Sequence, residues 1–322
     1  MNARVPTYSL NCSGKLLSLE TPKVMGILNA TPDSFYAGSR KQTELELAER
    51  AQQIISEGGA IIDVGAYSTR PGAADVSAEE EWTRLANALQ VVSREAPEAI
   101  LSVDTFRAEI ARRCVETFGV SIINDISGGD ADAQMFDTVA ELRVPYVLMH
   151  CQGTPQTMQQ TPTYKNVTAE VITDLSRKVR LLRQRGIRDV IIDPGFGFGK
   201  TLEHNYTLLR QLEDFRIFDL PLLVGVSRKS MITKPLGIPP DEALNGTTAL
   251  NAFALMKGAH LLRVHDVKAA VEVVKLFERV KIKDMPSGVS YTVSLLLYLY
   301  LPLAPQGIFY LSSFILYLLS SL

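Results

Sequence analysis

The feature that most constrains this chain is a repeated alternation, between Pro22 and Val280, of short apolar runs with longer stretches of helical periodicity. Each run is rich in Val, Ile and Leu, as expected of a strand buried on both faces. The expected strands are 24–29, 60–65, 100–104, 121–125, 145–150, 189–193, 221–227 and 260–265. Eight such βα pairs predict an α/β fold in the form of a closed (β/α)8 barrel, or TIM barrel.

The stretches between these runs carry apolar residues at one-face helical spacing. The first contains Leu47, Ala48, Ala51, Ile54 and Ile55, and the last contains Val267, Ala270, Val271, Val274 and Phe277. Residues 1–21 precede the first strand, and we expect them to form a short N-terminal hairpin that closes the bottom of the barrel. The predicted organisation is therefore a hairpin at 1–21, a barrel at 22–284 and a separate tail at 285–322.

Composition excludes several classes of protein. The chain has 33 Lys and Arg against 35 Asp and Glu, so it lacks the basic surplus of a general nucleic-acid binder. Three cysteines, Cys12, Cys114 and Cys151, show no metal-ligand spacing and suggest free thiols in a reducing compartment. The N-terminal stretch has no apolar run long enough for a signal peptide. These features predict a cytoplasmic protein.

Nearly every apolar run ends in a residue that can form hydrogen bonds, ionise or bind metal. In a barrel these strand ends converge on one face, where active sites of this fold lie. A single polar residue at such a position commonly caps the following helix, but a succession of them favours a site. The residues are Asn29, Asp63, Asp104, Asn124, Asp125, His150, Asp193, Ser227, Arg228, Lys229, Arg263 and His265.

Eight motifs surround these strand ends, in order and at barrel spacing. They begin with MGILNATPDSFYAGSR (25–40), DVGAYSTRPGA (63–73), SVDTFRAEIA (102–111) and INDISGG (123–129). The others are MHCQGTPQTMQ (149–159), DPGFGFGKTLEHNYTLL (193–209), VGVSRKSMI (224–232) and GTTALNAFALMKGAHLLRVHDV (246–267). Over about residues 22–280 the chain resembles the dihydropteroate synthases, the pterin-binding enzymes that sulfonamides target.

The resemblance implies an alkyl-transferring enzyme of folate biosynthesis. Such an enzyme condenses (7,8-dihydropterin-6-yl)methyl diphosphate with 4-aminobenzoate to give 7,8-dihydropteroate and diphosphate. It also implies loss of diphosphate before the amine attacks, assisted by Mg²⁺ and by basic side chains. No covalent nucleophile is then needed, which agrees with the absence of a Ser/His/Asp or Cys/His arrangement among the motifs. We interpret Cys151 as a packing variant.

A pterin presents a planar edge of alternating donors and acceptors, which calls for buried carboxylates and an amide. Asp104, Asn124 and Asp193 are residues of these types. The resemblance implies that all three bind the pterin, with Asp193 at the 2-amino and N3 edge and with Met149 and Lys229 alongside. The alternative for the two aspartates is helix capping, which the Pro194 and glycine-rich sequence after Asp193 disfavours.

A departing diphosphate needs cations and donors where negative charge develops. Arg70, Arg263 and His265 could supply them, and the spacing of Arg263 and His265 places both on one side of a strand. The resemblance implies that these three bind the diphosphate and that Asn29 contacts it as a ligand of Mg²⁺. Taken alone, Arg263 could be a surface charge and His265 a helix-start residue. The predicted catalytic set is Asp104, Lys229, Arg263, His265 and Arg70.

For 4-aminobenzoate, the resemblance implies a pocket bounded by two loops, 31–40 and 66–75. Their Gly, Ser and Pro content is typical of lids that order on substrate binding. The implied pocket residues are Thr69, Pro71, Phe35 and Phe198, with Ser227 and Lys229 at the carboxylate end. The chain departs from the family pattern at Gly65, Ala66, Tyr67 and Tyr36, which could alter lid closure or sulfonamide affinity.

The tail, residues 285–322, contains no Asp, Glu, Lys, Arg or His. It is long enough to span a bilayer, but Pro302, Pro305 and Gly307 divide it into two short pieces. Three interpretations stay open: a membrane tether, an extension that packs on the barrel or at a dimer interface, and a non-native C-terminus. The resemblance also implies a homodimer.

Two other functions compete with the synthase. A methyltetrahydrofolate:corrinoid methyltransferase shares the pterin-binding barrel but has no use for a diphosphate site at Arg263 and His265 or for Ser227 and Lys229. A non-catalytic pterin-binding scaffold is the second, and loss of Asn29, Arg70 or Lys229 would have suggested it. All three are present.

Overall fold

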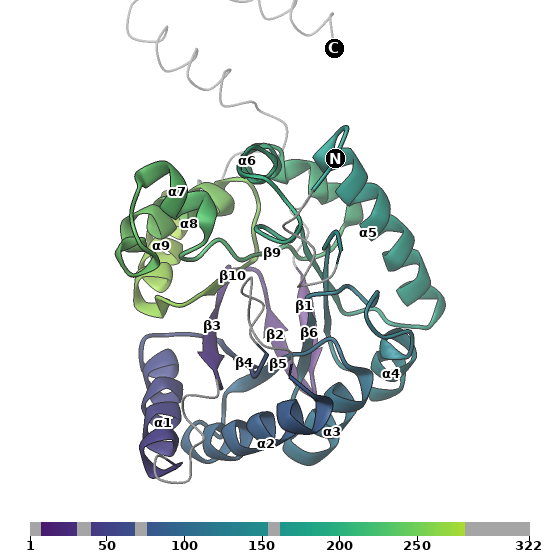
Figure 1. The fold of residues 1–322 in the computed structure, drawn as a ribbon, viewed down its shortest axis with the longest axis vertical. Helices are drawn as coiled ribbons and strands as arrows, with labels where there is room; N and C mark the ends of the chain where they lie inside the picture. Colours follow the sequence, from purple (N-terminus) through teal and green to yellow (C-terminus); the bar gives the residue numbers. More distant parts are fainter. Residues whose placement is uncertain (1–7, 31–39, 68–75, 154–161, 281–322) are drawn as a thin grey trace, which may run out of the picture. The chain divides into compact units, whose positions relative to one another are not determined.

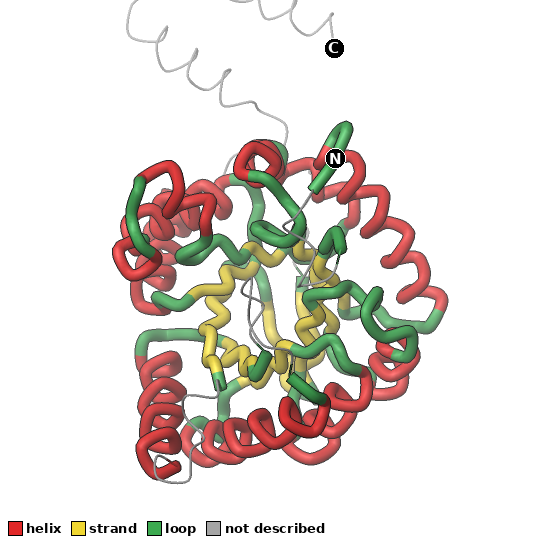
Figure 2. The backbone as a smooth tube through the Cα atoms, in the orientation of Figure 1, coloured by secondary structure: helices red, strands yellow, loops and turns green. Residues whose placement is uncertain are grey.

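Eight parallel strands form the centre of the computed structural model, which describes residues 8–30, 40–67, 76–153 and 162–280 (Figure 1). Their order is β8-β7-β6-β5-β4-β3-β10-β9, and a parallel bridge between Ile192 and Leu222 joins the two ends of the sheet. The sheet is therefore closed, with the helices arranged around it (Figure 2). The predicted (β/α)8 barrel is confirmed.

The barrel strands follow the predicted runs closely. They are β3 Lys23–Asn29, β4 Ile61–Gly65, β5 Ile100–Asp104, β6 Ile122–Asp125, β7 Tyr146–Met149, β8 Val190–Asp193, β9 Leu223–Val224 and β10 Leu261–Val264. The helices are α1 Arg40–Ser56, α2 Ala78–Glu95, α3 Ala108–Phe118, α4 Met135–Leu142, α5 Val167–Gln184, α6 Leu202–Arg210, α7 Ser230–Leu236, α8 Leu244–Met256 and α9 Val267–Val280. Two 3-10 turns, Leu212–Phe218 and Pro240–Glu242, precede β9 and α8.

One strand is shorter than its apolar run predicts. Residues 221–227 read as a strand, but only Leu223–Val224 pair as β9. Val226 is buried without joining the ladder, because its carbonyl accepts a bond from Lys229 N at 3.2 Å and the chain turns there. Arg228 takes a left-handed conformation, with φ at 57°, in that turn. Apolar burial therefore extends further than strand pairing.

The N-terminal hairpin is also confirmed. Strands β1 Ser9–Cys12 and β2 Lys15–Ser18 pair antiparallel around Ser13 and Gly14, both with positive φ, as two-residue hairpin turns require. Leu10, Cys12, Leu17 and Leu19 share an apolar cluster with residues of seven barrel strands: Met25, Ile61, Ile122, Val147, Ile191, Leu223 and Leu261. The hairpin thus fills the N-terminal end of the barrel, and the opposite end, formed by the carboxyl ends of the strands, is called the mouth below.

No helix in the described part of the chain is long and apolar enough to cross a membrane. The tail at 285–322, for which the sequence left three interpretations, lies outside the described residues, as do residues 1–7.

Candidate active site

Asp63, at the end of β4, joins side chains from three other strands. It is fully buried, and its Oδ1 accepts a hydrogen bond from Ser102 Oγ at 2.6 Å. Its Oδ2 accepts from Asn124 Nδ2 at 3.0 Å and from Arg263 Nε at 2.7 Å. The bonds to Oδ2 fix the orientations of Asn124 and Arg263. The Asn124 amide nitrogen faces Asp63, so its carbonyl oxygen is the group it offers to a ligand.

Arg263 bridges two carboxylates, since its Nη2 also donates to Asp104 Oδ2 at 2.7 Å. Burial raises the pKa of Asp104 to about 7; Arg263 opposes this rise and the charge of Asp63 adds to it. For Arg263, burial lowers the pKa, but the Asp63 and Asp104 carboxylates outweigh that effect and leave it above its ordinary value. The guanidinium stays charged, while Asp104 can exchange a proton near neutral pH.

Asp193 and Lys229 form the other half of the mouth. Asp193 Oδ1 accepts from Gly195 N at 2.7 Å, and burial raises the pKa of its carboxyl although Lys229 opposes the rise. Lys229 donates to the Phe196 carbonyl oxygen at 2.6 Å, and its Nζ lies 4.7 Å from the Phe198 ring centre. Burial lowers the pKa of Lys229 to about 8, with Asp193 acting in the opposite direction.

Ser227 and His265 contact each other across β9 and β10. The His265 backbone N–H donates to Ser227 Oγ at 3.1 Å, and the same Oγ lies 3.0 Å from His265 Nδ1. The hydroxyl can donate to Nδ1 when the ring proton is on Nε2, or accept from it when the proton is on Nδ1, so the contact holds the ring in place in either tautomer. Burial and the nearby Arg263 lower the pKa of His265 to about 4, so the ring is neutral at physiological pH.

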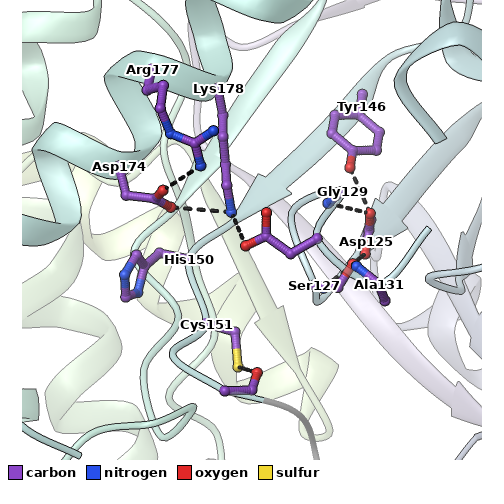
Figure 3. Close-up of polar contacts among 12 residues, drawn as sticks. Asp125, Ser127, Gly129, Ala131, Tyr146, His150, Cys151, Asp174, Arg177 and Lys178 are labelled. Carbon is purple, nitrogen blue, oxygen red and sulfur yellow. Dashed lines mark hydrogen bonds and ion pairs between the residues drawn. The ribbon is translucent and has the colours of Figure 1, made fainter. Parts of the chain in front are cut away.

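The loop after β6 is held beside Asn124 by the adjacent carboxylate. Asp125 accepts from Ser127 N and Oγ, each at 2.7 Å, from Gly129 N at 2.8 Å and from Tyr146 Oη at 2.6 Å (Figure 3). These four hydrogen bonds all come from this loop and from β7. Asp125 therefore supports the site by holding the loop in place. Burial raises the pKa of its carboxyl against these hydrogen bonds.

The structure brings together most predicted residues that it describes. Asp104, Asn124 and Arg263 form one network with Asp63, while Asp193, Lys229 and Phe198 form a second group. Met149 is buried at the end of β7, opposite Asp193 in the strand register. Asn29 is exposed at the end of β3. Phe35, Thr69, Arg70 and Pro71 lie outside the described residues, so their predicted roles stay predictions.

Two features of the site differ from the predicted residue roles. Asp63 was recognised only as one polar strand end among many, although it contacts both Asn124 and Arg263. Ser227, predicted at 4-aminobenzoate, lies against His265, which was predicted at the diphosphate. Its role at 4-aminobenzoate remains a prediction.

The described residues contain no cluster of three or more His, Cys, Asp or Glu side chains suited to a metal ion. An amide oxygen such as that of Asn29 is nevertheless a hard ligand of the kind Mg²⁺ prefers, and Mg²⁺ commonly takes its remaining ligands from water and substrate phosphates. The donor set at the mouth therefore fits a magnesium ion carried largely by a diphosphate.

Comparisons with known proteins agree with this arrangement. A family model described as a pterin binding enzyme matches residues 25–265. The dihydropteroate synthase of Escherichia coli (strain K12) is 45% identical over 271 residues, covering 84% of this chain and 95% of that protein. The dihydropteroate synthase of Synechocystis is 42% identical over 256 residues, covering 79% of this chain and 88% of that protein.

Solved structures show the same similarity. The Yersinia pestis dihydropteroate synthase in complex with a sulfonamide drug has a TM-score of 0.79 at 38% identity, covering 85% of this chain and 99% of its own. The Xanthomonas albilineans enzyme with 4-aminobenzoic acid has a TM-score of 0.78 at 37% identity, covering 86% and 99%. The Xanthomonas albilineans complex with 7,8-dihydropteroate has a TM-score of 0.74 at 33% identity, covering 85% and 98%.

Proposed function

Because this chain belongs to the pterin-binding enzymes and, within them, to the dihydropteroate synthases, we propose that the mouth of its barrel performs their condensation with the residues described above. The bond between the pterin methylene carbon and a diphosphate oxygen breaks, and its electron pair leaves with diphosphate. A carbon–nitrogen bond to 4-aminobenzoate forms, and the amine releases a proton. The product is 7,8-dihydropteroate, which serves folate biosynthesis.

One observation carries the assignment of residues: a single buried carboxylate, Asp63, orients both Asn124 and Arg263 toward the mouth. Asn124 offers an acceptor, and Asp104 and Asp193 supply carboxyl groups on either side. This set matches the alternating donors and acceptors of a pterin edge. Lys229, held by the Phe196 carbonyl, adds one donor at the boundary between the pterin and 4-aminobenzoate.

The diphosphate binds on the side of Arg263 and His265. Arg263 supplies a permanent positive charge, while His265 supplies a neutral imidazole ring that Ser227 keeps in place. Both act where negative charge increases as the carbon–oxygen bond breaks. Arg70, predicted to close over the diphosphate, would add a second guanidinium.

Mg²⁺ is the cofactor of this proposal, with Asn29 as its ligand from the protein. When bound, the ion neutralises part of the charge on the leaving diphosphate. The exposed position of Asn29 at the end of β3 leaves it accessible to a hydrated metal ion.

4-Aminobenzoate occupies the outer part of the mouth, where the Phe198 ring lies beside Lys229. The Lys229 ammonium attracts the benzoate carboxylate, and its lowered pKa of about 8 still leaves it mostly charged at neutral pH. Phe35, Thr69 and Pro71 are proposed to complete this pocket. The Xanthomonas albilineans enzyme solved with 4-aminobenzoic acid supports the choice of substrate.

The remaining proposals concern assembly and location. Phe253 and Met256 lie three residues apart on one face of α8 and are 41% and 74% exposed, which supports a homodimer interface on that face. Among the described residues Cys12, Cys114 and Cys151 form no disulfide, which supports a reducing compartment such as the cytoplasm.

The function is tested by incubating the full-length chain with the dihydropterin diphosphate and 4-aminobenzoate and measuring dihydropteroate, with and without Mg²⁺. We expect magnesium-dependent product that falls by a factor of about 100 or more in Lys229→Ala. A folded chain that binds the pterin but forms no product would favour the non-catalytic scaffold. Product without any Mg²⁺ requirement would remove the metal from the proposal but keep the reaction.

A further inference from the structure

Lys200 is an almost fully buried cation, 3% exposed, at the end of the loop that follows β8. Its Nζ donates to the carbonyl oxygens of Gly195 and Phe198, each at 2.9 Å, and of His150 at 3.3 Å. It also lies 3.1 Å from His150 Nδ1. Burial and the Lys200 charge lower the pKa of His150 to about 3, so this ring is neutral.

Among the described residues, all hydrogen-bond partners of the Lys200 ammonium are uncharged. Burying an ammonium without a counter-charge costs free energy of folding. Such an arrangement is expected to serve a purpose beyond the stability of the barrel. Its three carbonyl partners come from two different segments, the end of β7 at His150 and the loop at Gly195 and Phe198. The ammonium therefore holds these two segments together.

The packing between the two segments is close enough to require glycine. Gly195 has a φ of 73°, and a side chain there would overlap the His150 carbonyl oxygen. Gly199 has a φ of 59°, and its Cβ would lie 2.5 Å from the Gln152 carbonyl oxygen. Asn205 Oδ1 accepts from Gly197 N at 2.7 Å, and Tyr164 Oη donates to the Gly199 carbonyl at 2.9 Å. The loop is therefore held by contacts from several segments, and the Lys200 ammonium lies among them.

This loop carries groups that act in the mouth. The Phe196 carbonyl accepts from Lys229, the Phe198 ring lies beside the same ammonium, and Gly195 N donates to Asp193. A shift of the loop would displace Lys229 and Asp193 together. A misplacement of about 1 Å at a reacting centre can cost about 100-fold in rate.

Lys200 also acts through its charge. Burial raises the pKa of Asp193, and the Lys200 charge is one of the influences that oppose the rise, together with Lys229 and Arg263. The pKa of Lys200 itself is lowered to about 7 by burial, assisted by Lys229 and opposed by Cys151 and Asp193. Beside the loop, the rings of His150, Tyr164 and His204 form a chain of contacts.

We propose that Lys200 is a positioning residue for the pterin site, which fastens the loop 194–199 to the end of β7 and thereby holds Asp193 and Lys229 in place. The inference rests on the proposed function, since it assumes that Asp193 and Lys229 bind the pterin substrate. Lys200 itself does not contact substrate in this arrangement.

Lys178 offers a matched control. It is also a fully buried lysine, 1% exposed, but its Nζ pairs with Asp130 at 2.6 Å and Asp174 at 3.1 Å (Figure 3). It reaches from α5 to the loop after β6 and has no bond to the loop 194–199. Loss of Lys178 should therefore reduce stability without changing how Asp193 titrates.

The experiment compares wild type, Lys200→Met and Lys178→Met by direct binding of the dihydropterin diphosphate between pH 5 and 8 and by steady-state kinetics. We expect Lys200→Met to weaken binding about 10- to 100-fold. Its acid limb should move to higher pH, because removing a cation raises the pKa of Asp193 and protonates it sooner. Lys178→Met should keep the wild-type acid limb.

Lys200→Gln separates the two contributions. The amide still donates to loop carbonyls but carries no charge, so it should recover part of the lost affinity while keeping the shifted acid limb. If Lys200→Met and Lys178→Met lose affinity equally with unshifted pH profiles, Lys200 is structural only and the inference is overturned. Failure of both Lys200 variants to fold would also overturn it in favour of a stability role. Failure of the wild type to bind the pterin would instead refute the proposed function.

Discussion

Asp63 and Arg263 lie 200 residues apart in the chain, yet Asp63 Oδ2 accepts from Arg263 Nε at 2.7 Å inside the barrel. The same oxygen accepts from Asn124, so one buried carboxylate orients a cation and an amide at the mouth. Asp63 is itself fully buried, which assigns it a supporting position behind the groups that meet substrate.

Asp63→Asn should impair both the fold and the site. The new side chain would carry no charge, so Arg263 would lose a buried counter-charge. Removing one member of a buried ion pair typically costs about 3–5 kcal/mol. We expect a loss of that order in the free energy of unfolding, measured by urea denaturation, and at least about a 100-fold loss in kcat/KM. Near-wild-type kinetics would show that Asp104 alone suffices to orient Arg263.

Asp104 should make stability depend on pH. Its pKa in the folded chain is about 7, above the ordinary value of 3.8, so the folded state binds the proton more tightly than the unfolded state. The contribution of Asp104 to the free energy of unfolding is fully present below about pH 4 and is lost as the pH rises through 7. It amounts to at most about 4 kcal/mol. Denaturant titrations at several pH values should show a flatter dependence in Asp104→Asn. An equal slope in both proteins would contradict the prediction.

Ser227→Ala should affect diphosphate recognition selectively. Without the hydroxyl, His265 Nδ1 loses its side-chain hydrogen-bond partner, and the imidazole ring is no longer held in one orientation. The dihydropterin diphosphate should bind about tenfold more weakly, the equivalent of one net hydrogen bond to a charged group. The corresponding pterin alcohol, which lacks diphosphate, should bind as to wild type in calorimetry.

A different outcome would assign Ser227 to the other substrate. If Ser227→Ala raises the KM for 4-aminobenzoate and leaves diphosphate binding unchanged, the serine serves the second substrate, as the family resemblance implies. Lys229→Ala provides the comparison, because it should weaken both substrates.

The barrel could be predicted from residue types because eight Val-, Ile- and Leu-rich runs have few other ways to be buried. The strand-end rule also located the polar groups of the mouth. The same rule could not show which of these side chains contact each other. Asp63, Asn124 and Arg263 come from three different strands, and their contacts depend on how the barrel closes. The sequence does not predict a role for Lys200, because a lysine at the end of a loop is ordinarily exposed. Its role becomes visible only in the structure, where its ammonium donates to three carbonyl oxygens from two segments.

Gly195 provides the sharpest test of how tightly the loop after β8 is held. Its φ of 73° already disfavours any side chain, and a Cβ would overlap the His150 carbonyl oxygen, a backbone atom that cannot rotate away. Gly186 is the matched control, because its φ is 83° and its Cβ would meet nothing within 4 Å. Gly186→Ala should cost only the left-handed backbone penalty of about 1 kcal/mol, measured by thermal or urea unfolding.

Gly195→Ala should cost about 3–5 kcal/mol in the same measurement, since steric overlap adds to the backbone penalty. It should also weaken pterin binding, because the strain is relieved by moving the loop that carries the Phe196 carbonyl and the Asp193 contact. Gly186→Ala should leave binding intact. If the two variants are equally stable, the loop is free to shift away from β7, and its close contact with His150 does not determine the geometry of Lys229.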